Sequence, residues 1–119
     1  MADTTTTIES LKNDVKKFTE ERDWQQFHSP KNLSMAIASE SAELMDLFLW
    51  CEKEESYEIL EKRRQEVEDE VADIAHLVLA FCVRYNIDLS KAMVHKRIEW
   101  TRKYPVEKSK GKWTKYTEL

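Results

Sequence analysis

The sequence predicts an all-α protein, an antiparallel bundle of about four helices followed by an irregular, basic C-terminal tail. The 119 residues include only one glycine and two prolines, too few for the turns of hairpins or sandwiches. Apolar residues also recur at helical spacing through most of the chain. Because the length suits one domain, we expect residues 1–119 to fold as a single unit.

The first helix should begin near Thr6, because Thr6 and Glu9 have the spacing of a capping box. Its apolar positions step by three and four residues, as one face of a helix does. These positions are Ile8, Leu11, Val15 and Phe18. The pattern loses its phase over residues 23–28, so we expect the first helix to end there.

Three further helices are expected. Ser29 suits the N-cap and Pro30 the first position of a second helix, which should run to about Cys51. After an acidic connector, Ser56 should cap a third helix from about Tyr57 to Arg84. Asp88 should cap a fourth helix that ends before Pro105, and residues 105–119 form the lysine-rich tail.

Two pairs of acidic residues interrupt the apolar faces of the second and third helices. The first face comprises Leu33, Ala36, Ile37, Leu44, Leu47 and Phe48. Glu40 falls near its centre and Glu43 at its edge. The other face comprises Val67, Val71, Ile74, Val78 and Phe81. Glu70 falls within it and Asp73 at its border. Because carboxylates on an inward face are costly without a compensating cation, the four acids predict a divalent metal site, with Mg²⁺ as the expected ion.

Composition narrows the possible partners and the compartment. A net charge of −4 argues against binding of polymeric nucleic acid. No run reaches 18 apolar residues, and the segment Met1 to Ile8 lacks the apolar core of a signal peptide. Cys51 and Cys82 lie within helical patterns and are expected to be free thiols. We therefore expect a soluble, cytoplasmic protein that does not associate with membranes.

The predicted helices carry more apolar surface than one chain can cover. The third helix is apolar on nearly all sides, and Ala72, Ala75, Leu79, Ala80 and Cys82 occupy the side away from its main face. The second helix adds Met35, Met45 and Leu49. A homo-oligomer would cover these surfaces. The alternative is that the first helix and the tail cover them within one chain.

The acidic pattern resembles a known family signature. Glu40-x-x-Glu43, a gap of 26 residues and Glu70-x-x-Asp73 resemble the motif of the all-α nucleoside triphosphate pyrophosphohydrolases, the MazG-like proteins, and their dCTP pyrophosphatase branch. Further similarity to that branch, in the same order, spans most of the chain. It lies in residues 18–28, 47–50, 103–106 and 115–119.

The resemblance implies a reaction and a site. A nucleoside triphosphate, such as dCTP, is cut between its α and β phosphates into monophosphate and pyrophosphate, which cleans or balances the nucleotide pool. Glu40, Glu43, Glu70 and Asp73 are implied as the Mg²⁺ ligands. One of these carboxylates can activate water, and we expect Glu43, at the edge of its helix face, or else Glu40, in this role. The resemblance also implies a homotetramer built as a dimer of dimers.

The resemblance further implies substrate-binding residues. Trp24 and Trp50 match aromatic walls around the base, and His28 matches a position near its edge. Ordinary packing is the alternative role for both tryptophans. Lys96 and Tyr104 match positions near the phosphates. The chain departs from the family at Trp100, where asparagine is frequent, and at Leu77, where tyrosine is frequent, so the preferred base and sugar stay open.

Two other functions remain open from the sequence. A helical interaction module without enzymatic activity would keep the acids but would not need a metal. A pyrophosphohydrolase of the dUTP or phosphoribosyl-ATP type would share the fold and the metal chemistry. Binding of Mg²⁺ separates the first alternative from the enzyme, and a substrate screen separates the second.

Overall fold

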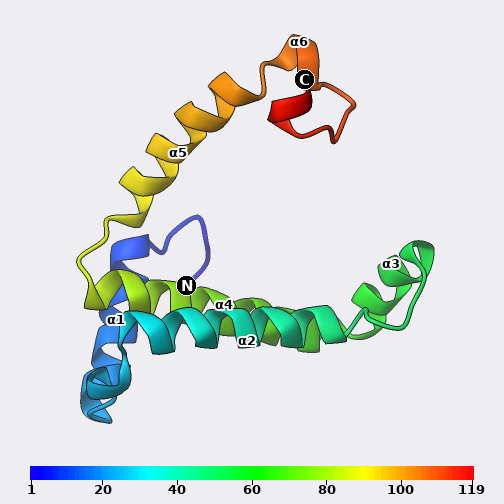
Figure 1. Cartoon of the computed structure of the whole chain (residues 1–119). Coiled ribbons are helices and arrows are strands. Elements are labelled where there is room, and N and C mark those ends of the chain that lie inside the picture. The colour runs from blue at the N-terminus through cyan, green and yellow to red at the C-terminus, as the bar shows by residue number, and fades with distance from the viewer. The chain divides into compact units, whose positions relative to one another are not determined.

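A computed structural model describes all residues, 1–119, and every regular element in it is a helix (Figure 1). This confirms the predicted all-α class. The chain forms six α-helices and two short 3₁₀ helices, more than the four helices expected. The residues group into two compact units, Met1–Asn86 and Ile87–Leu119.

Helix α1 (Ile8–Glu21) opens the first unit. Its N-cap is Thr7, not Thr6 as predicted, and the Thr7 hydroxyl oxygen accepts a hydrogen bond from the Ser10 N–H at 3.1 Å. The reason for the shift is local, because the Thr6 N–H donates to the Ala2 carbonyl in a preceding turn. After α1, Asp23 adopts a positive φ of 51° and leads into the 3₁₀ helix η1 (Gln25–Phe27).

Helix α2 (Pro30–Asp46) begins as predicted. The Ser29 hydroxyl accepts from the Asn32 N–H at 3.0 Å, and Pro30 occupies the first turn. The helix ends at Asp46, before the expected end near Cys51. Residues 47–49 continue with bonds between residues three apart, such as Phe48 N–H to Met45 carbonyl at 3.0 Å, so the chain tightens into turns.

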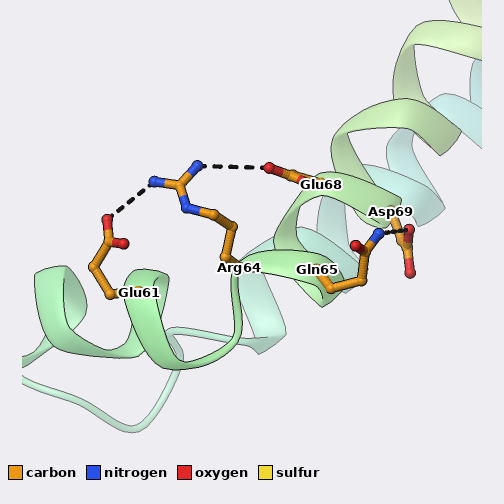
Figure 2. A network of polar contacts seen from close by, with 5 residues as sticks. All are labelled: Glu61, Arg64, Gln65, Glu68 and Asp69. Carbon is orange, nitrogen blue, oxygen red and sulfur yellow. Dashed lines mark hydrogen bonds and ion pairs between the residues drawn. The ribbon is translucent and has the colours of Figure 1, made fainter.

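The predicted third helix is two helices, α3 (Lys53–Lys62) and α4 (Arg64–Arg84). They are separated at Arg63, whose φ of −115° and ψ of 31° are not helical. Helix α3 starts after Glu52, not at Ser56, and the Glu52 N–H donates to the Glu55 carboxylate. Arg64, just after the break, pairs with Glu61 and Glu68 (Figure 2). The N–O distances of these ion pairs are 3.0 Å and 3.6 Å.

Helices α2 and α4 run antiparallel and side by side, and α1 and α3 also contact α4 (Figure 1). The buried core joins α1, α2 and α4 through Val15, Leu33 and Ala80. Leu79 packs against this core, so our prediction that it belongs to a free second surface was wrong. The Tyr85 hydroxyl donates to the His28 carbonyl at 2.6 Å, which ties the end of α4 to the start of α2.

Part of the expected free apolar surface is present. The α2 side chains Met35 and Met45 are 60% and 55% exposed. Val71, which we expected on the inner face of α4, is 50% exposed. No helix has the combination of length and apolar character that crossing a membrane requires.

The second unit contains α5 (Leu89–Lys103), α6 (Val106–Ser109) and the 3₁₀ helix η2 (Tyr116–Glu118). As predicted, the Asp88 carboxylate caps α5 by accepting from the Lys91 N–H at 3.0 Å, and α5 ends before Pro105. The basic tail is less irregular than expected, since it holds α6 and η2. The Tyr104 and Tyr116 rings meet edge to face, with centroids 5.9 Å apart.

Candidate functional site

The four acids predicted to share a site lie together on α2 and α4. Each of Glu40, Glu43, Glu70 and Asp73 offers one carboxylate oxygen, and these four atoms all lie within 4.8 Å of one another. Residues three apart share one face of a helix, so each helix presents two carboxylates. Because α2 and α4 run side by side, the two pairs face each other across the helix interface.

Burial divides the acidic cluster, Glu40, Glu43, Glu70 and Asp73, into two kinds of residue. Glu40 and Glu70 are partly buried, whereas Glu43 and Asp73 are exposed. The Oε2 atoms of Glu40 and Glu70 are buried and have no hydrogen-bond partner. Unpaired buried carboxylate oxygens are rare and costly in folded proteins. The inner half of the cluster therefore lacks a positive partner from the chain.

Crowding changes the proton affinity of the two inner acids. A hydrogen bond with the Glu43 carboxyl group is the main cause that raises the pKa of Glu40, and burial and the charges of the other three acids add to it. Burial is the main cause that raises the pKa of Glu70, followed by the charge of Glu43. Both shifts show that the folded cluster disfavours full ionisation.

This arrangement suits a hard divalent cation. Carboxylate oxygens are the ligands that Mg²⁺ and Ca²⁺ take, and a cation would supply the charge that the two buried oxygens lack. The exposed edge formed by Glu43 and Asp73 leaves room for water or for the oxygens of a substrate. The acidic cluster can therefore bind a metal.

A groove of about 700 Å³ adjoins the acidic cluster. Its walls are α1 and α4, together with Trp24, and both Glu40 and Asp73 line it. Most of its other lining side chains are apolar. These are Leu11, Val15, Phe18, Ala72, Ala75, Leu77 and Leu79. The volume falls within the range of small-molecule sites, and apolar walls beside a polar end are typical of them.

Of the four predicted substrate-binding residues in the first unit, two line the groove and two do not. Trp24 and Leu77 line the groove, and Trp24 is 46% exposed. Its ring meets Phe18 edge to face at 5.7 Å. Trp50 follows α2, is 94% exposed and does not line the groove. His28 lines a separate cavity of about 200 Å³ with Arg84.

The surroundings of His28 favour its neutral form. Burial is the main cause that lowers the pKa of His28, and the charges of His76 and Arg84 lower it further. The neutral imidazole can both donate and accept a hydrogen bond.

The remaining predicted residues, Lys96, Trp100 and Tyr104, lie in the second unit. Lys96 pairs with Glu99 at 3.0 Å, and Lys103 pairs with the same carboxylate at 2.7 Å. Their hydrogen bonds lower the pKa of Glu99 to about 2. Trp100 is 53% exposed. The roles of Lys96, Trp100 and Tyr104 stay predictions.

Two polar side chains of the groove were not predicted as site residues, Asp14 of α1 and His76 of α4. His76 lies one helical turn after Asp73, and this spacing was a signal that the sequence contained. Asp14 gave no comparable signal, because it lies on the first helix among other exposed charges.

Comparison with known proteins places this site in a family. A model of the MazG-like family matches residues 35–119. The chain is 36% identical to dCTP pyrophosphatase 1 of Bos taurus over 115 residues, which cover 95% of this chain and 68% of the relative. The Homo sapiens protein of that name is 33% identical over 115 residues, which again cover 95% of this chain and 68% of the relative.

The fold also resembles that of a solved structure. The fold superposes on a pyrophosphatase from Archaeoglobus fulgidus with a TM-score of 0.81 at 35% identity, covering 88% of this chain and 98% of the other. All four residues of the acidic cluster lie within the residues that the family model matches. The chain belongs to the MazG-like family.

Proposed function

We propose that this nucleotide pyrophosphohydrolase acts on dCTP or a closely related deoxynucleoside triphosphate. It hydrolyses the bond between the α and β phosphates and releases monophosphate and pyrophosphate. The observation that carries the proposal is the acidic cluster, in which four carboxylates from two helices meet and two of them bury an unpaired oxygen. Nucleotide-pool house-cleaning follows as its role, and the names of the relatives support the choice of dCTP.

Mg²⁺ is the proposed cofactor, held by Glu40, Glu43, Glu70 and Asp73. The ion prefers oxygen ligands and commonly joins carboxylates to substrate phosphates. When bound, it would neutralise charge on the phosphate oxygens that the four carboxylates would otherwise repel. The two buried oxygens support a cation at this place, because the chain itself provides no donor to them.

Glu43 is the proposed general base. Its carboxylate is exposed, so water can reach it, and one of its oxygens lies within 4.8 Å of a Glu40 carboxylate oxygen. A carboxylate in this position can accept a proton from the attacking water at one of its oxygens. Glu40, Glu70 and Asp73 would hold the ion beside the base, and Glu40 is the alternative candidate for the base itself.

The groove is the proposed site of the nucleoside. With the triphosphate at the acidic cluster, the base would lie against Trp24 and Leu77, which line the groove. Stacking on an indole supplies affinity for any base. His28, Trp50, Lys96, Trp100 and Tyr104 are proposed to contact substrate on the strength of the family resemblance.

We propose a homo-oligomer, a dimer of dimers, in the cytoplasm. Met35, Met45 and Leu49 of the α2 region are about half exposed, and further large apolar side chains are exposed on α5. Such surface is usual at interfaces and unusual on isolated monomers. Two free cysteines, Cys51 and Cys82, support a reducing compartment.

A substrate screen tests the proposed function. Ribo- and deoxynucleoside triphosphates are incubated with Mg²⁺, and pyrophosphate, phosphate and monophosphate are measured separately. Pyrophosphate and dCMP from dCTP are expected. Glu40→Gln should lose turnover, whereas Glu54→Gln, an exposed acid on α3, should keep it. Release of phosphate with a diphosphate product would contradict cleavage between the α and β phosphates, and a better rate with dUTP would contradict the substrate.

A further inference from the structure

The groove contains two polar side chains that the proposed function has not used. Apart from the acids Glu40 and Asp73, its only charged or titratable lining residues are Asp14 and His76. Asp14 is exposed, and its carboxylate has no hydrogen-bond or ion-pair partner. His76 is partly buried, and its ring meets the Phe18 ring edge to face at 5.6 Å and 84°.

Their placement separates them from the metal ligands but keeps them in the same groove. His76 follows Asp73 by one helical turn on α4, about 4.5 Å along the axis. Asp14 precedes Phe18 by one turn on α1, so both lie on the same face of that helix. Phe18 contacts both His76 and Trp24, so these three rings form one connected wall of the groove that Asp14 also lines.

A base that enters this groove takes water away from Asp14. An ionised carboxylate only accepts hydrogen bonds, so it needs a donor on the base once water is excluded. Cytosine offers an exocyclic amine as donor, beside a ring nitrogen that accepts. Uracil and thymine offer a carbonyl oxygen in place of the amine, and this oxygen would face the carboxylate as a second acceptor.

We propose that Asp14 and His76 determine base specificity, selecting a base with an exocyclic amine next to a ring acceptor, as in cytosine, over the keto bases. Asp14 accepts from the amine and His76 donates to the ring acceptor, while Trp24 and Phe18 provide the apolar walls. The inference rests on the proposed function for its substrate class, and it adds the residues that discriminate. Selectivity of this kind is strong, because a keto base that displaces the water around the Asp14 carboxylate offers it no donor in exchange.

Binding measurements test the proposal without relying on turnover. The affinities of the α,β-imido analogues of dCTP and dUTP are measured by calorimetry with Mg²⁺ for wild type and variants. Wild type should prefer the dCTP analogue by about tenfold or more. Asp14→Asn should lose most of that preference, because an amide can turn its donor toward the uracil oxygen. Glu9→Gln removes one charge from the same helix outside the groove, and it should keep the preference.

A second variant tests His76. His76→Phe keeps an aromatic ring against Phe18 but removes the donor, so affinity for the dCTP analogue should fall several-fold with little change in melting temperature. Equal binding of the two analogues by wild type, or an unchanged preference in Asp14→Asn, would overturn the proposal. A preference that depends on Asp14 in a protein that hydrolyses neither nucleotide would support the specificity and refute the proposed function.

Discussion

Replacing Glu70 by glutamine should stabilise the metal-free protein and remove its stabilisation by Mg²⁺. Glu70 has a buried Oε2 atom without a partner, and burial and the neighbouring carboxylates raise its pKa. Glutamine keeps the shape of the side chain and removes the charge. The repulsion within the acidic cluster should then fall, and so should the affinity for a cation.

The size of the Mg²⁺ effect follows from mass action. A ligand that binds only the folded state stabilises it by about 2.7 kcal/mol when its concentration is 100 times the dissociation constant. For a chain of 119 residues this corresponds to a rise in melting temperature of roughly 10 °C. Glu70→Gln should show only a small part of this rise at the same concentration.

Thermal melts followed by circular dichroism measure both effects. Wild type and Glu70→Gln are compared in chelator and in MgCl₂ at equal ionic strength, so that general screening cancels. Glu54→Gln is the matched control, because it removes an exposed acid of α3 outside the cluster and should behave as wild type. An equal Mg²⁺ shift in wild type and Glu70→Gln would refute the metal-site reasoning, as would the absence of any shift in wild type.

Four further outcomes are expected. The folded protein raises the pKa of Glu40 and Glu70 above the ordinary 4.5, so the folded state binds protons more tightly than the unfolded state does. Lowering the pH from 7 toward 4.5 should therefore stabilise metal-free wild type relative to Glu70→Gln. Melts at stepped pH in chelator measure this difference, and a constant difference would contradict it. Trp24→Ala should weaken substrate binding by about 1–3 kcal/mol, read as a higher KM with the fold intact; a lower melting temperature at unchanged KM would indicate packing alone. Leu33→Ala should cost about 2–5 kcal/mol in the free energy of unfolding, measured with urea, because Leu33 is 2% exposed in the core. Met45→Glu should dissociate the oligomer, which light scattering measures as a lower molar mass than that of wild type. A wild-type monomer of 14.2 kDa in the same measurement would contradict the proposed assembly.

Several features could be predicted from the sequence because their causes are local. Ser29 and Asp88 cap their helices as expected, since a capping side chain bonds to a backbone N–H only a few residues away. The inward position of Glu40 and Glu70 followed from the helical period of the apolar residues around them. That period also indicated which four carboxylates would meet, once two helices were assumed to pair.

Other features depend on contacts between helices, which a single sequence does not display. The break at Arg63 interrupts a segment of good helix formers without glycine or proline, so no local signal marked it. The exposure of Val71 and the partial burial of Leu79 depend on how neighbouring helices pack against α4, which tertiary contacts decide.

The same distinction holds for the candidate site. The sequence by itself identified the members of the acidic cluster, because each pair interrupts the apolar face of its helix and the whole pattern resembles a family motif. Only the tertiary structure brought Asp14 of α1 into one groove with His76 of α4 and Trp24, and placed His28 in another cavity. The physical reason is that helix pairing fixes which faces meet, and the spacing of residues along one helix carries no information about the opposite wall.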